Sequence, residues 1–171
     1  MHDQMLMTLH IRFSRSHGAH PALDGAAASC CLRTTTTTIN MSLTIQSQNK
    51  VFEGVLTKYS FRSKVLGGLE AKMNVFLPES ANAGHKVPVL YFLSGLTCTE
   101  DNAAQKGHFF EAAAKEQLAI VFPDTSPRGA NIPGEEDSWD FGTGAGFYVN
   151  ATKEPWNKYY NMYDHCLLYT S

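Results

Sequence analysis

The sequence has little charge and no large excess of one sign. Charged residues make up 18% of the 171 residues, and the formal net charge is −2. Proteins that bind nucleic acid or anionic lipid need a clustered basic surface, so this composition argues against both partners. No stretch approaches the roughly eighteen apolar residues that would span a bilayer. The composition therefore favours a globular protein that acts on a small molecule and uses neither nucleic acid nor a membrane.

Cysteine is scarce and lacks the spacing of a metal site. The four cysteines are Cys30, Cys31, Cys98 and Cys166, and none of them forms the CxxC pair that is typical of zinc ligands. The N-terminus also lacks the continuous apolar segment and small-residue cleavage site of a secretory signal. We therefore expect a reduced, cytoplasmic protein without a metal.

Two further segments could suggest a cofactor or metal. The glycine-rich segment Gly142–Gly146 (GTGAG) lacks the Lys-Ser/Thr that follows a phosphate-binding loop, so we expect no nucleotide. The acidic run Glu135–Asp137 could be a carboxylate pair for acid–base chemistry or a metal site. Because neither histidine spacing nor a calcium-loop pattern accompanies it, a solvated loop is the favoured interpretation. The sequence thus predicts a protein without cofactors.

The first forty residues differ from the rest of the chain. Residues 1–40 show no periodicity and end in the five threonines Thr34–Thr38. Such a segment cannot offset the entropy of ordering, so we expect it to be disordered. Because patterned sequence begins at Met41, one hypothesis is that Met41 is the true start and that residues 1–40 are a non-native extension. Residues 41–165 are then expected to form one domain.

Two alternating segments come first in the patterned region. Residues 52–61 and 71–77 alternate as half-buried strands, and the Gly67-Gly68 pair between them predicts an antiparallel hairpin. Residues 87–93 (VPVLYFL) are apolar on both faces, which predicts a central strand covered by helices.

A helix and a second strand follow. Residues 102–117 place apolar side chains at helical spacing, with Asp101 near the helix start, and residues 118–122 (LAIVF) predict a buried parallel strand. A hairpin followed by parallel strands with a crossover helix is the opening of an α/β fold. Residues 124–156 are rich in glycine and proline and nearly aperiodic, so functional residues are expected there. A new helix is expected from Asn157.

Three segments carry a family resemblance, namely Tyr91–Glu100 (YFLSGLTCTE), Phe122–Gly129 (FPDTSPRG) and Glu135–Ala151 (EEDSWDFGTGAGFYVNA). Their sequences, order and spacing resemble those of the S-formylglutathione hydrolases, the esterase D family. The resemblance covers residues 41 to about 164. It implies a serine hydrolase of the α/β-hydrolase fold that converts S-formylglutathione and water to glutathione and formate, a step of formaldehyde detoxification.

The chemistry of this family needs a serine on a GxSxG elbow, followed by an acid and a histidine. The sequence contains no GxSxG motif. The family pattern places that elbow after the helix expected from Asn157, so all three catalytic residues are expected to be missing. The chain then corresponds to a truncated α/β-hydrolase, the N-terminal half, which is inactive alone. Residues 166–171 (CLLYTS) depart from the family pattern, and we interpret them as an artefactual tail.

The resemblance assigns roles around the segment that follows the expected central strand. Leu96 would donate its backbone N–H to the oxyanion hole. A donor of this kind is typically worth about 3 to 4 kcal/mol in acyl transfer. Gly95 would allow close backbone approach. Cys98 would lie beside the site and modulate it, although a structural thiol is the other interpretation.

Aromatic residues surround the glycine-rich segment. Trp139, Phe141 and Tyr148, together with Phe147, suit one wall of an acyl or thiol pocket. Packing of the same rings beneath a long loop is an equally open alternative.

Two other functions remain open on the sequence alone. A general carboxylesterase of the same fold would share all these features, and a non-catalytic module could have kept the opening of the fold. For the complete enzyme, a homodimer is a further expectation.

Overall fold

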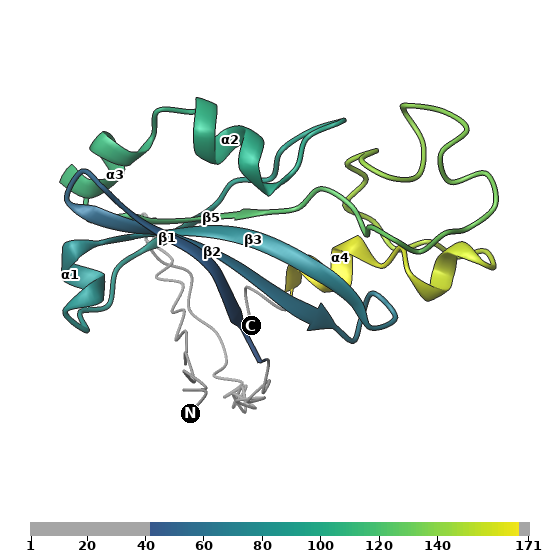
Figure 1. The fold of residues 1–171 in the computed structure, drawn as a ribbon, viewed down its shortest axis with the longest axis horizontal. Helices are drawn as coiled ribbons and strands as arrows, with labels where there is room; N and C mark the ends of the chain where they lie inside the picture. Colours follow the sequence, from purple (N-terminus) through teal and green to yellow (C-terminus); the bar gives the residue numbers. More distant parts are fainter. Residues whose placement is uncertain (1–41, 168–171) are drawn as a thin grey trace, which may run out of the picture.

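The computed structural model describes residues 42–167, which form a five-stranded sheet with helices packed on it (Figure 1). The predictions for residues 1–40 and for most of the expected tail lie outside these residues. In chain order the elements are β1 (Thr44–Val51), β2 (Gly54–Ser63), β3 (Leu69–Pro78), α1 (Glu79–Asn82), β4 (Val89–Tyr91), α2 (Glu100–Lys106), α3 (Phe110–Lys115), β5 (Ala119–Pro123), the 3-10 helix Trp156–Lys158 and α4 (Met162–Leu167).

Strands β2 and β3 form the predicted hairpin. They pair antiparallel without a break over all ten residues of each strand. The connection places Gly67 and Gly68 at φ of 64° and 83°, a left-handed conformation that glycine adopts without steric cost. The prediction from the alternating pattern and the Gly-Gly pair is therefore confirmed.

Strand β1 was not predicted from the sequence. It pairs antiparallel with β2 at one edge of the sheet, and every residue in it except Val51 is exposed. An alternating pattern arises only when one face of a strand is buried, so this polar strand leaves no such signal.

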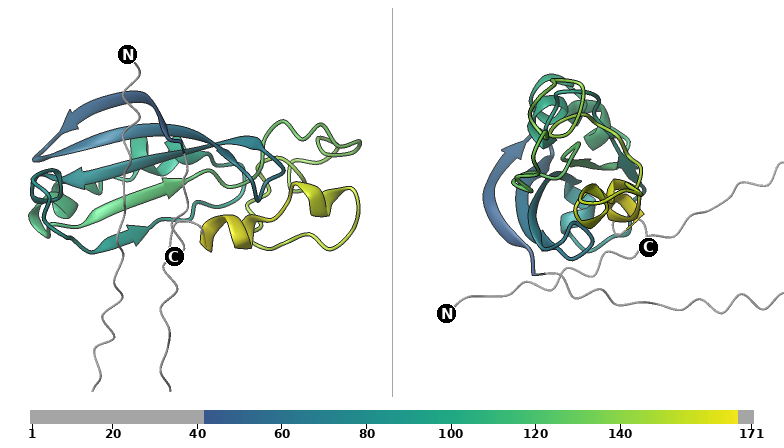
Figure 2. Two further views of the ribbon diagram at one scale, coloured as in Figure 1. Left: turned by 90° about the horizontal axis from the view of Figure 1, so that it is seen from below. Right: turned by 90° about the vertical axis from the view of Figure 1, so that its right-hand side faces the viewer.

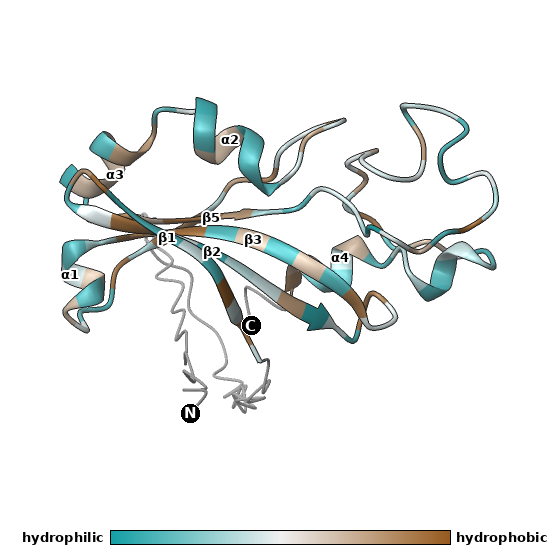
Figure 3. Cartoon of the chain, in the orientation of Figure 1, coloured by the Kyte–Doolittle hydropathy of each residue, from teal (hydrophilic) through white to brown (hydrophobic). Residues whose placement is uncertain are grey.

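The sheet order is β1-β2-β3-β5-β4, with β4 parallel to β5. All five residues of β5 are buried, as predicted, and most of this strand is hydrophobic (Figure 3). The prediction of a central strand over residues 87–93 is wrong for the described sheet, because β4 spans only three residues and lies at the edge. Leu90 and Leu93 are 45% and 47% exposed. A continuous apolar run indicates that both faces of a strand can be buried, but it does not show whether the strand has a hydrogen-bonded partner strand on both edges.

The single helix expected over residues 102–117 is two short helices, α2 and α3. The chain leaves α2 at Gly107, and His108 takes a positive φ of 51°. An added Cβ at Gly107 would lie 2.0 Å from the Phe109 ring, so this close approach requires glycine. The break turns Phe109 onto Phe92, with ring centroids 5.1 Å apart. The apolar spacing was interpreted correctly as helical, but its continuity was not.

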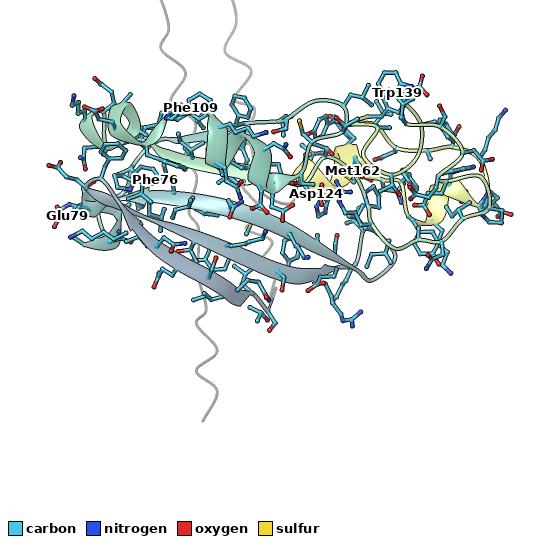
Figure 4. The ribbon with its side chains drawn as sticks, turned by 45° about the horizontal axis from the view of Figure 1, so that its top comes forward. Phe76, Glu79, Phe109, Asp124, Trp139 and Met162 are labelled. Carbon is cyan, nitrogen blue, oxygen red and sulfur yellow. The ribbon has the colours of Figure 1, made fainter. Side chains whose placement is uncertain are left out.

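Alternation along β3 and β5 divides the core between the two faces of the sheet. Phe76 (Figure 4) and Phe122 lie on the face covered by α2 and α3. The Phe76 and Phe110 rings lie 5.0 Å apart. Val75 and Val121 face the other side, where Met162 of α4 joins their cluster. Helices α2 and α3 therefore cover one face of the sheet and α4 packs on the other, as in an α/β layered fold.

The segment from Asp124 to Pro155 contains none of the helices or strands named above and extends beyond the end of β5 (Figure 2). This confirms the predicted aperiodic stretch. The helix expected from Asn157 begins only at Met162, after one turn of 3-10 helix. Among the described residues, no helix is both long and apolar enough to cross a membrane.

Candidate active site

Three loops meet beyond the carboxyl ends of the parallel strands β4 and β5. They are Ser94–Cys98, which follows β4, Asp124–Gly129, which follows β5, and the glycine-rich segment Gly142–Gly146. Hydrogen bonds join the first loop to both of the others, as detailed below. In open α/β sheets ligands bind at this end of the strands, so the sheet itself selects this region as the candidate site.

The Ser94–Cys98 loop presents a backbone donor. None of the described residues accepts a hydrogen bond from the Leu96 N–H, whereas the next N–H, that of Thr97, donates to the Gly144 carbonyl oxygen at 2.7 Å. Thr97 holds a positive φ of 64°, which reverses the chain immediately after Leu96. The N–H groups of Ser94 and Gly95 likewise have no acceptor among the described residues, so the loop presents successive unpaired donors, as an oxyanion hole needs.

The glycine-rich segment lies directly against this loop. An added Cβ at Gly146 would lie 3.1 Å from the Leu96 nitrogen, and Gly142 leaves only 2.0 Å for a Cβ beside the Glu135 carbonyl oxygen. Gly144 donates its N–H to Ser126 Oγ at 2.7 Å. Gly146 therefore allows close backbone packing against the Ser94–Cys98 loop and Gly142 allows it against Glu135, whereas an added Cβ at Gly95 meets no described atom within 4 Å.

Buried polar residues after β5 hold the far end of the Ser94–Cys98 loop. Arg128 donates to both carboxylate oxygens of Asp124, at 2.7 and 2.9 Å. The same guanidinium donates to the Cys98 carbonyl oxygen at 3.2 Å, and the fully buried Thr125 hydroxyl donates to that oxygen too. Hydrogen bonding to Asp124 raises the pKa of Arg128, so the guanidinium stays charged. These contacts fix the Cys98 backbone and leave its half-buried thiol free.

A second polar cluster anchors helix α2, which follows the loop. Thr99 caps the helix in a reciprocal arrangement with Asn102. Lys58 of β2 lies 2.8 Å from the buried Glu100 carboxylate and 2.6 Å from that of Asp101. Burial alone would lower the pKa of Lys58, but its hydrogen bonds to the two carboxylates outweigh burial and raise it. The helix and the loop before it are thereby tied to the sheet.

The aromatic residues that the sequence singled out have different positions. Tyr148 donates its hydroxyl to the Ser94 carbonyl oxygen at 2.7 Å, and burial raises the pKa of this phenol, which therefore stays protonated. Phe141 lines a largely apolar cavity of about 120 Å³ with Trp156 and other side chains, and the two rings meet edge to face at 4.9 Å. Trp139 is 71% exposed and lies at the outer rim of the loop region (Figure 4).

The structure therefore brings Gly95, Leu96, Cys98 and Tyr148 together and places Phe141 in the cavity beside them. Trp139 does not join this group. Gly146 lines the cavity and also packs against Leu96, so the cavity borders the Ser94–Cys98 loop.

The solvated-loop interpretation of the acidic run is wrong for its first residue. Glu135 is only 4% exposed. Its carboxylate accepts hydrogen bonds from the Ile132 N–H, at 3.0 Å, and from the Tyr160 hydroxyl. Glu136 and Asp137 are exposed, as expected. A buried carboxylate costs free energy unless it is hydrogen-bonded. Both hydrogen-bond partners of Glu135 lie outside the acidic run, so the run alone could not indicate that this residue is buried.

Asp124, Thr125, Ser126 and Arg128 were not assigned roles from the sequence. They lie within Phe122–Gly129, one of the segments that carry the resemblance, and polar residues directly after a fully apolar strand fall at the carboxyl edge of the sheet. Within residues 42–167, no group of three or more histidine, cysteine or acidic residues is placed to hold a metal ion.

Comparison with known proteins agrees with this geometry. The family model described as "Putative esterase" matches residues 63–169. S-formylglutathione hydrolases from Mus musculus and Arabidopsis thaliana are 51% and 50% identical, over 73% and 68% of this chain. The chain spans only 44% and 40% of their lengths.

A solved structure of an S-formylglutathione hydrolase from Agrobacterium tumefaciens matches with a TM-score of 0.67 and 43% identity, over 71% of this chain and 43% of that one. The family model alone matches more than half of the chain. The chain therefore belongs to the esterase family, and the relatives that it resembles are S-formylglutathione hydrolases.

Proposed function

We propose that the protein carrying this chain is a serine hydrolase that cleaves S-formylglutathione to glutathione and formate, and that this chain supplies its oxyanion hole. The observation that carries the proposal is the Leu96 N–H, which has no acceptor among the described residues and lies on a loop bonded at both ends. The sequence identity to S-formylglutathione hydrolases supports the choice of substrate.

In the proposed reaction a serine hydroxyl attacks the formyl carbon of the thioester. The carbonyl oxygen gains negative charge, and the Leu96 N–H donates a hydrogen bond to it. The C–S bond then breaks, glutathione leaves as the thiol, and water releases formate from the acyl enzyme. Since residues 1–171 contain no GxSxG motif, the nucleophile is assigned to the part of the relatives that the chain does not span.

Replacing Leu96 by proline tests the donor. Proline removes the N–H, and no described residue loses a hydrogen bond by this change. We expect kcat of the whole protein on S-formylglutathione to fall about 10²- to 10³-fold, with little change in melting temperature. Leu96→Ala keeps the N–H and should keep the rate. Equal rates in both variants would remove the proposed role.

The substrate is tested separately by steady-state kinetics of the unmodified protein. We expect a higher kcat/KM for S-formylglutathione than for simple aryl esters. The reverse preference would identify a general carboxylesterase, and the absence of both activities would favour the non-catalytic module.

The same proposal includes a cytoplasmic enzyme of formaldehyde removal that functions as a homodimer. Cys98 and Cys166 are both free, which suits a reducing compartment. Native mass spectrometry of the protein from its source measures both its subunit mass and its oligomeric state.

A further inference from the structure

Two side chains from outside the Ser94–Thr97 segment hold its two ends. Tyr148 donates its hydroxyl to the Ser94 carbonyl oxygen at 2.7 Å. At the other end, the Thr97 N–H donates to the Gly144 carbonyl oxygen, and the Gly144 N–H donates in turn to Ser126 Oγ, both at 2.7 Å. The bonded groups flank Leu96, whose N–H, like that of Gly95, has no acceptor among the described residues.

Both hydroxyls are already engaged with the backbone. Ser126 is 6% exposed, and its Oγ also donates to the Pro127 carbonyl oxygen at 3.1 Å. Tyr148 is half-buried and has its one proton on Ser94. Ser126 lines the cavity, but neither hydroxyl has a free proton for a ligand, although the sequence had suggested Tyr148 as a substrate contact.

We propose that Tyr148 and Ser126 are positioning residues, which hold the Ser94–Thr97 segment so that the Leu96 N–H meets the oxyanion. This inference rests on the proposed function. Tyr148 fixes the peptide unit before Gly95, and Ser126 fixes Gly144, which carries the acceptor for Thr97. Loss of the Tyr148 hydroxyl frees one end of the segment directly, and loss of the Ser126 hydroxyl loosens Gly144, which holds the other end. A displacement of about 1 Å from the productive geometry can reduce a rate about 10²-fold.

The test uses Tyr148→Phe and Ser126→Ala in the whole protein that carries this chain. Tyr163→Phe is the matched control, because Tyr163 is 56% exposed on α4. The substrates are S-formylglutathione and p-nitrophenyl acetate. We expect kcat to fall at least about 10-fold in each variant while KM changes less than about twofold, because the donor acts only in the transition state.

Comparing the loss of rate on the two substrates distinguishes a positioning residue from a residue that contacts the substrate. Oxyanion stabilisation is common to all acyl transfers, so both substrates should lose rate by the same factor. A loss confined to one substrate, or seen mainly in KM, would overturn the inference. If the unmodified protein cleaves only the aryl ester, the proposed substrate is wrong, while the positioning test remains valid on that ester.

Hydrogen exchange gives a readout that does not depend on activity. The Thr97 amide should exchange faster in both variants than in the unmodified protein and in Tyr163→Phe. Unchanged exchange at residues 95–98 in folded variants would overturn the inference, whatever the kinetics. Because the two variants act at opposite ends of the segment, either one suffices if the other does not fold.

Discussion

Replacing Gly146 by alanine tests directly how closely the glycine-rich segment packs against the Ser94–Cys98 loop. The φ of Gly146 is +72°, and an added Cβ would lie 3.1 Å from both the Gly95 carbonyl carbon and the Leu96 nitrogen. Gly146→Ala therefore combines backbone strain with crowding of the proposed donor. Gly84 separates these two effects, because its φ is +87° and an added Cβ meets no described atom within 4 Å.

The expected magnitudes follow from these contacts. A residue with a Cβ in the left-handed region costs about 1 to 2 kcal/mol, and this is the whole expected loss of stability in Gly84→Ala. Overpacking adds about 1 to 3 kcal/mol, so Gly146→Ala should lose roughly 2 to 5 kcal/mol. The neighbouring loop must also move by a few tenths of an ångström, which displaces the Leu96 N–H.

Urea denaturation of both variants measures the two free energies, and kcat on S-formylglutathione measures the displacement. Gly146→Ala should lose both stability and kcat, whereas Gly84→Ala should lose only stability. Equal stability losses in the two variants would refute the close approach of Gly146 to Leu96. A full rate in a folded Gly146→Ala protein would refute the link between that approach and catalysis.

Two further predictions concern the groups that anchor the layers of the fold. Lys58→Met leaves the buried Glu100 carboxylate without its cation, which should cost about 3 kcal/mol in urea denaturation, whereas Lys115→Met breaks only an exposed pair and should change nothing measurable. Burial lowers the pKa of His165 from 6.5 to about 4, so the unfolded chain binds the proton more tightly. Stability should be constant above about pH 6.5 and fall by about 3 kcal/mol as the pH decreases to 4, a slope that His165→Gln should remove.

The sequence predicted those parts of the fold whose signal is local. The hairpin follows from alternation and two glycines, and β5 follows from five consecutive apolar residues. Features that depend on neighbours elsewhere in the chain were not predictable. The edge position of β4 depends on which strands pair with it, and the division of one expected helix at Gly107 depends on the packing of Phe109 against Phe92.

The candidate site shows the same division. Family resemblance brought attention to Leu96, whose N–H has no acceptor among the described residues, and its role as the oxyanion donor stays a prediction. It suggested substrate contact for Tyr148, whereas the structure shows its hydroxyl on the Ser94 backbone. A phenol beside a glycine-rich loop suits either role equally well in the sequence, because the distinguishing partner is 54 residues away.

The Ser94–Cys98 loop is held by hydrogen bonds from residues that are far away in the sequence. Its backbone bonds reach residues 54 positions away at Tyr148 and 27 positions away at Thr125, and Gly144 in turn reaches 18 positions back to Ser126. Burying Thr125 and Ser126 costs free energy unless their hydroxyls are paired, so the folded sheet edge stabilises only the loop conformation that pairs them. If the Leu96 N–H is the oxyanion donor, as proposed, it is held in place before substrate arrives, and no reorganisation is needed when charge develops on the carbonyl oxygen.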